Sequence, residues 1–143
     1  MVKRLHEPVL DQLLAVVLLL NADATESLGR LGLSVPRATL AWQLHHEGPL
    51  TQRALADALR VTPRNVTGLV DGLVETGFVT REPHPTDRRA TLVSLTAHGA
   101  DVMEEMARQY VELAELLFGD MTEFPAFARG LEHVLHKLQA ALA

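Results

Sequence analysis

The residues of this sequence that could do chemistry gather at the start of one predicted helix. The helix begins after Thr62, which can cap it, and Pro63 suits its first position. Arg64, Asn65 and Thr67 follow and point outward. Arginine can bond guanine bidentately and asparagine can bond adenine, so these side chains suit base edges in a DNA major groove. A polar first turn also fits an ordinary surface helix, and the flanking sequence decides between the two interpretations.

The element that positions these side chains is an amphipathic helix that ends at Gly77. Its apolar residues recur at helical spacing and share one face: Val66, Leu69, Val70, Leu73 and Val74. Before it, Thr51 can cap a short helix over residues 52–59, and a turn of about three residues joins the two. This is the helix-turn-helix arrangement, with the second helix in the recognition position. Gln52 and Arg53 begin the short helix, as candidates either for phosphate contact or for plain solvated surface.

A predicted β-hairpin follows the recognition helix. The residue period changes to two, which predicts strands at residues 78–82 and 90–95. The loop between them contains two prolines and ends in Arg88 and Arg89. A hairpin in this place is a wing, and arginines near its tip can enter a minor groove, whose negative potential attracts them. Arg81, in the first strand, is a further basic candidate for DNA contact.

Charge and composition restrict the classes of partner. The 143-residue chain has a net charge of −5, but residues 50–95 carry six arginines against five carboxylates. That balance has the right sign for a DNA-facing centre between acidic flanks. Aromatic residues make up only 4%, which leaves little for stacking on single-stranded nucleic acid. The absence of cysteine excludes disulfides, thiolate metal sites and cysteine redox sensing.

Four longer helices are predicted around this centre. They run from Pro8 to about residue 28, from about Val35 to just before Gly48 with Ser34 as cap, from Thr96 to about Phe118, and from about Phe124 to Leu142. The first is apolar over more than half of its circumference, so it requires burial on more than one side. It is either the central core helix or a helix covered by a second subunit. A heptad-like seam on the third consists of Met103, Met106, Tyr110, Leu113 and Leu117.

The sequence gives no support for a membrane protein or an enzyme. The apolar run Leu13–Leu20 is too short to span a bilayer and lacks a signal-peptide cleavage site, so we expect a cytoplasmic protein without membrane contact. No Ser/His/Asp set, glycine-rich phosphate loop or carboxylate pair in an apolar setting stands out. We therefore predict no catalytic residue and no cofactor. His133 and His136, beside Glu132, are better explained as surface histidines than as metal ligands.

Four segments carry a more specific pattern: Leu50–Ala56, Val66–Val79, Pro85–Ala90 and Val93–Gly99. The most specific part is Asp-Arg-Arg at residues 87–89, followed by Leu-Thr-x-x-Gly at residues 95–99. In this order and spacing, the chain resembles the MarR family of bacterial winged-helix regulators. Asp87 is expected to order the wing by pairing with an arginine.

The resemblance implies a mainly α fold in a single subunit spanning residues 1–143. A winged helix-turn-helix at residues 34–96, with a three-helix core and a two-stranded wing, would be flanked by dimerisation helices at residues 8–30 and 97–142. Proteins of such families are homodimers that bind palindromic double-stranded DNA. The first prediction for this chain is therefore a repressor, and an activator is the alternative. The DNA-contact candidates are Gln52, Arg53, Thr62, Pro63, Arg64, Asn65, Thr67, Arg81, Arg88 and Arg89.

The resemblance also implies an effector site, because small aromatic or phenolic anions commonly bind between the dimer helices and the winged domain. Arg37, Trp42, His45 and His46 on the second helix could supply an aromatic wall and hydrogen-bond donors. Core packing and exposed histidines are the alternative explanation. A winged-helix module for protein–protein assembly, without specific DNA binding, is the alternative function, and the acidic net charge is its best support.

Overall fold

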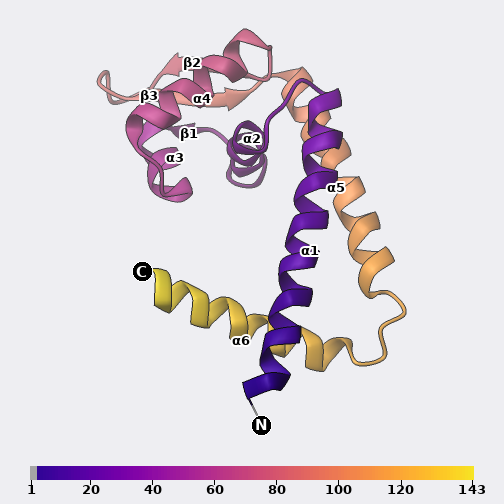
Figure 1. The fold of residues 1–143 in the computed structure, drawn as a ribbon. Helices are drawn as coiled ribbons and strands as arrows, with labels where there is room; N and C mark the ends of the chain where they lie inside the picture. Colours follow the sequence, from indigo (N-terminus) through magenta and orange to yellow (C-terminus); the bar gives the residue numbers. More distant parts are fainter. Residues whose placement is uncertain (1–2) are drawn as a thin grey trace. The chain divides into compact units, whose positions relative to one another are not determined.

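The computed structural model describes residues 3–143, with side chains from Leu5 onward. The described chain contains six helices and one three-stranded sheet (Figure 1). It divides into two compact units, Met1–Met103 and Glu104–Ala143. The elements are α1 Lys3–Arg30, α2 Val35–Glu47, β1 Leu50–Thr51, α3 Gln52–Leu59, α4 Pro63–Glu75, β2 Val79–Pro83, β3 Thr91–Leu95, α5 Ala97–Phe118 and α6 Phe124–Leu142.

The three helices of the helix-turn-helix region begin where the sequence predicts. In each, a capping hydroxyl oxygen accepts a hydrogen bond from the backbone N–H three residues on, at 3.3 Å for Ser34, 3.0 Å for Thr51 and 3.1 Å for Thr62. Each cap satisfies one of the N–H groups that a helix start leaves without a partner. The predicted stops at Gly48 and Gly77 are also confirmed, with φ angles of 79° and 82° that favour glycine.

The sheet has one strand more than the sequence predicts. Its order is β1-β3-β2 with antiparallel pairing, and Leu50 of β1 lies opposite Val93 of β3. Two residues are too few to show the alternation by which strands are recognised, so β1 gave no signal. The wing strands β2 and β3 begin one residue later than predicted, at Val79 and Thr91.

The core of the first unit forms around the apolar face of α4. Val66, Val70 and Leu73 are fully buried, whereas Leu69 is half-buried and Val74 remains 40% exposed. The other large side chains that are fully buried come from neighbouring elements: Leu40, Leu55, Val79, Val93 and Met103. The predicted stripe therefore docks the helix and leaves Arg64 and Asn65 of its first turn exposed.

A tight joint connects the end of α4 to the start of α5. The Thr96 hydroxyl donates to the Gly77 carbonyl oxygen at 2.6 Å and accepts from the Gly99 N–H at 3.0 Å. The Thr96 N–H donates to the Phe78 carbonyl oxygen at 3.0 Å. A Cβ at Gly99 would lie 2.1 Å from that same oxygen, closer than any real contact. The joint gives a physical reason for the Leu-Thr-x-x-Gly spacing.

Helix α1 is longer and more exposed than predicted. It begins at Lys3 and includes Pro8, which was expected to start it. Within the described helix only Leu28 is buried, so α1 is not the central core helix of this chain. An 18-residue window within Leu5–Arg30 has a mean hydropathy of 1.4, and by length and composition alone the helix could cross a membrane. The short run Leu13–Leu20 therefore does not by itself exclude a span.

The second unit contains most of α5 and all of α6. The Phe118 ring contacts those of Phe124 and Phe127, with centroid distances of 5.5 and 5.7 Å. No described residue of α6 is buried. Its predicted apolar face is open to solvent in a single copy: Phe124, Phe127, Leu131, Val134, Leu135, Leu138 and Leu142.

The joint at Gly99 generates a stability prediction. Gly99→Ala should lower the free energy of unfolding by about 1–3 kcal/mol, because its methyl group must displace the Phe78 carbonyl. Gly68→Ala in α4 is the control: nothing lies within 4 Å of its Cβ, and the change should stabilise by about 0.5–1 kcal/mol. Urea unfolding followed by circular dichroism measures both, and a Gly99→Ala variant as stable as wild type would contradict the role of the joint.

Candidate nucleic-acid interface

The first turn of α4 presents free polar side chains. Arg64 and Asn65 are exposed, and neither side chain has a hydrogen bond or ion pair within the part of the chain that the structure describes. The Thr62 hydroxyl is occupied by its capping bond to the Asn65 N–H, and Pro63 is exposed at the first helical position. Two polar side chains on the first turn of a docked helix are therefore available to an outside partner.

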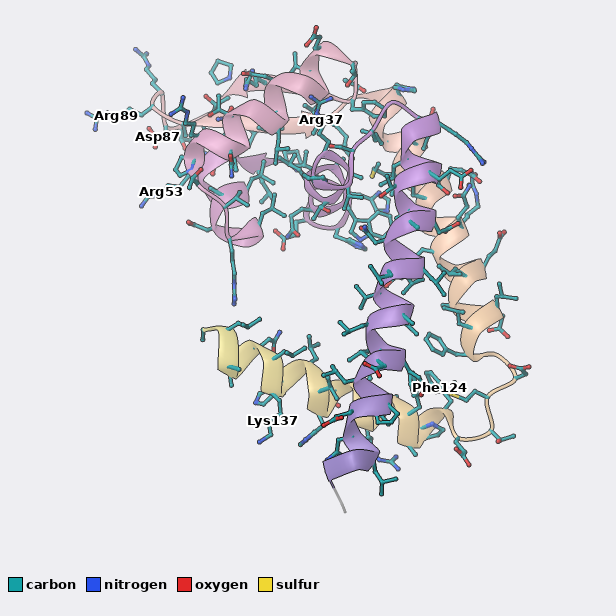
Figure 2. All side chains as sticks on the ribbon, viewed as in Figure 1. Arg37, Arg53, Asp87, Arg89, Phe124 and Lys137 are labelled. Atoms are coloured by element: carbon teal, nitrogen blue, oxygen red, sulfur yellow. The ribbon has the colours of Figure 1, made fainter. Side chains whose placement is uncertain are left out.

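An open hollow between α3 and α4 brings further candidates together. Its lining residues are Gln52, Arg53, Ala56, Asp57, Val61, Pro63 and Thr67, four of which the sequence nominated. Arg53 is exposed, and in Figure 2 it projects outward from α3. The start of α3 and the start of α4 thus form one surface.

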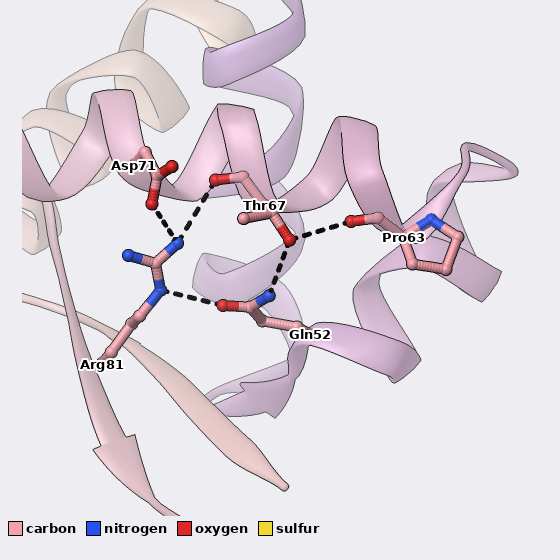
Figure 3. Close-up of polar contacts among 5 residues, drawn as sticks. All are labelled: Gln52, Pro63, Thr67, Asp71 and Arg81. Atoms are coloured by element: carbon pink, nitrogen blue, oxygen red, sulfur yellow. Dashed lines mark hydrogen bonds and ion pairs between the residues drawn. The ribbon is translucent and has the colours of Figure 1, made fainter.

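Three of the nominated side chains are engaged inside the protein (Figure 3). Arg81 Nε donates to Gln52 Oε1 at 2.8 Å, and its Nη2 donates to the Thr67 carbonyl oxygen at 3.2 Å. The same Nη2 lies 2.5 Å from a carboxylate oxygen of Asp71. Gln52 Nε2 donates to the Thr67 hydroxyl at 3.3 Å, and that hydroxyl donates to the Pro63 carbonyl oxygen at 3.0 Å. This network ties α3, α4 and β2 together.

The wing tip is ordered by two acceptor side chains. His84 Nδ1 accepts from the backbone N–H groups of Thr86 and Asp87, at 3.2 and 3.1 Å. Asp87 Oδ1 accepts from the Arg89 N–H at 3.0 Å. Among the described residues Asp87 has no ion pair with a guanidinium, so it orders the loop through a backbone amide rather than through an arginine side chain. The role of His84 was missed, although acceptor side chains that bond the backbone a few residues on are common in turns.

The two wing arginines remain free. Arg88 and Arg89 are exposed and have no ion pair in the described chain. Figure 2 shows Arg89 projecting from the loop that joins β2 and β3, with Asp87 beside it. The turn fixes the backbone and leaves the cationic side chains to solvent.

The effector candidates on α2 separate into two groups. The rings of Trp42, His45 and His46 form a cluster, with centroids 4.8–5.4 Å apart. Arg37 is half-buried, and its guanidinium lies against Gly72 of α4, where a Cβ would be 2.4 Å from the guanidinium carbon. Arg37 therefore packs across the α2–α4 contact, apart from the ring cluster.

Comparison with known proteins gives close sequence relatives for the central region. Residues 33–91 match a family model described as MarR family. An uncharacterized HTH-type transcriptional regulator of Mycobacterium leprae is 43% identical over 65 residues, covering 46% of each chain. The HTH-type transcriptional repressor IacR of Pseudomonas putida is 30% identical over 114 residues, covering 78% of this chain and 68% of IacR. The chain spans about half the length of the mycobacterial relatives that it matches.

Solved structures extend the likeness to almost the whole chain. The structure of Streptococcus pneumoniae FabT in complex with DNA has a TM-score of 0.89 at 18% identity, covering 95% of this chain and 99% of that one. At this identity the likeness concerns the fold, and it confirms the predicted mainly α, winged helix-turn-helix class. The two sequence relatives are named as a regulator and a repressor, not as enzymes, which confirms the prediction of a non-enzymatic protein.

Proposed function

The chain belongs to the MarR family, and from this premise we propose that it is a sequence-specific regulator of transcription that binds double-stranded DNA, acting as a repressor. One observation carries the proposal: Arg64 and Asn65 stand free on a docked recognition helix, next to an ordered wing with free arginines. The name of IacR and the DNA complex of FabT support the same class of function.

In this proposal α4 reads base edges and the wing reads the minor groove. Arg64 suits guanine and Asn65 suits adenine, each with about 1–3 kcal/mol of discrimination against a wrong base. Arg53, at the rim of the hollow, would contact phosphate beside the exposed start of α4. Arg88 and Arg89 would follow the narrow groove, whose potential attracts guanidinium groups.

We further propose that the active form is a homodimer on a palindromic site, in the cytoplasm. The support is the amount of apolar surface that one copy leaves exposed on α1 and α6, such as Leu18 at 69% and Leu135 at 55%. A second copy explains the exposed face of α1 better than a bilayer does. Asp11 and Asp23 are separated by about 18 Å along the helix, less than the roughly 30 Å of a hydrocarbon core, so a span would bury at least one carboxylate.

The alternative is an assembly module without specific DNA binding, supported by the net charge of −5. Selection of bound duplexes from a random pool separates the two functions. We expect enrichment of a palindrome with half-sites about one helical turn apart, the spacing for a two-fold dimer. Asn65→Ala should alter the base preference within each half-site. Failure of the wild-type protein to enrich any sequence would contradict the regulator and favour the assembly module.

The wing assignment has its own test. Arg88→Ala combined with Arg89→Ala should weaken binding to most duplexes and reduce the slope of log affinity against log salt by about one per lost phosphate contact. The matched control is Arg30→Ala with Arg108→Ala, which removes the same charge from exposed intrahelical ion pairs. An affinity and a slope equal to those of the control would exclude the wing from the interface.

We also propose that a small aromatic or phenolic acid modulates DNA binding through the ring cluster on α2. Because Trp42 is the only tryptophan, its fluorescence reports this site directly. Titration with salicylate should change the Trp42 emission and weaken operator binding over the same concentration range. His45→Ala, which removes one ring of the cluster, should shift both curves to higher concentration. An operator affinity that salicylate leaves unchanged, while Trp42 emission responds, would argue against modulation.

A further inference from the structure

We propose that Arg81 is a positioning residue: it fixes the recognition helix relative to the wing and does not itself contact DNA. The inference deepens the proposed function and rests on it. The sequence gives Arg81 as a further basic candidate for DNA contact, together with Arg88 and Arg89. The structure separates it from them, because its guanidinium already has partners on two other elements.

Most of the hydrogen-bonding capacity of the Arg81 guanidinium is used within the protein. Nε is used by Gln52 at the start of α3, and Nη2 is used by the Thr67 carbonyl and the Asp71 carboxylate in the middle of α4. A phosphate or a guanine is recognised bidentately by two neighbouring N–H groups of the fork. With the Nε and Nη2 edge occupied, as Figure 3 shows, a bidentate contact from Arg81 to DNA must break at least one of the bonds that Nη2 makes to Thr67 and Asp71, and only Nη1 is left for a single contact.

The charge of Arg81 is balanced by a carboxylate on α4. Asp71 lies on the outer face of α4 and its side chain is 60% exposed, so without a partner it would repel phosphate next to the groove. Arg81 neutralises it locally, while the Arg81 side chain itself is only 31% exposed. The pair therefore adds no net positive charge to the interface. Removing both charges together should leave the number of released counterions unchanged.

The hydrogen bonds around Arg81 also link three elements mechanically. Gln52, Thr67 and Arg81 belong to α3, α4 and β2, and each is bonded to the other two. A shift of the wing relative to α4 must break at least one of these bonds. At only one placement of the wing relative to α4 can α4 contact base edges while the wing contacts the minor groove. Loss of the network should therefore lower affinity for the operator more than affinity for unrelated DNA.

The experiment uses Arg81→Met combined with Asp71→Asn in the full chain, which removes the ion pair without changing the net charge. Affinity is measured against the selected operator and an unrelated duplex between 50 and 200 mM salt. We expect the ratio of operator to unrelated affinity to fall by about ten-fold, with the salt slope of wild type retained. Arg89→Ala is the comparison variant, and it should lower the slope. A slope reduced by about one in the double variant, with the ratio retained, would make Arg81 a DNA contact and overturn the proposal.

Two further measurements keep the test decisive. If the double variant does not fold, Gln52→Ala removes the Nε acceptor and leaves every charge in place, and the same fall in the ratio is expected. Residual dipolar couplings of the DNA-free protein report the orientation of β2 and β3 relative to α4. They should change in the variants that lose the network, and unchanged couplings would overturn the positioning role even if wild type bound no DNA. Absence of operator binding by wild type, with changed couplings, would instead contradict the proposed function alone.

Discussion

The placement of α4 is the constraint on which the winged unit depends. Burial of Val66, Val70 and Leu73 supplies the driving force, on the order of 1.5–3 kcal/mol for each fully buried side chain. Apolar contact is not directional, so it leaves the rotation and axial position of the helix loosely specified. Directional bonds from other elements then set them: Arg81 on the outer face and Thr96 at the end, whereas the Thr62 cap fixes where the helix begins. The side chains of the first turn can be free because the rest of the helix is held.

The parts of this arrangement that were predictable from sequence are those decided by neighbours along the chain. A hydroxyl three residues before an N–H, or a glycine at a helix end, acts locally, which is why Thr62 and Gly77 were placed correctly. The strand β1 was missed because its only support is pairing with β3, more than forty residues away. The start of α1 was misplaced for a different reason: Pro8 is compatible with a helix start but does not require one.

The candidate site shows the same limit at the level of single residues. Arg64 and Arg81 are the same residue type in the same basic region, and nothing local distinguishes them. Their difference arises from Gln52, which lies 29 residues before Arg81 in sequence and accepts from its Nε. Asp87 was correctly expected to order the wing, but its acceptor geometry selects the Arg89 backbone amide rather than a guanidinium. Residue type therefore gives candidate contact residues, whereas tertiary hydrogen bonds decide which of these residues keep free donor groups.

The acidic net charge is compatible with DNA binding once its position is considered. Field strength at a groove depends on charges within about a Debye length, roughly 8–10 Å at physiological salt, so carboxylates far from the interface contribute little. Near the interface, Asp71 is neutralised by Arg81, and Glu75 lies in the last turn of α4, away from Arg64. The exposed arginines at the start of α4 and at the wing tip then have Asp57, in the hollow, and Asp87, in the wing loop, as nearby carboxylates. Only the first half of α4 would then enter the groove, and the salt dependence of binding would report Arg53, Arg88 and Arg89 rather than the charge of the whole subunit.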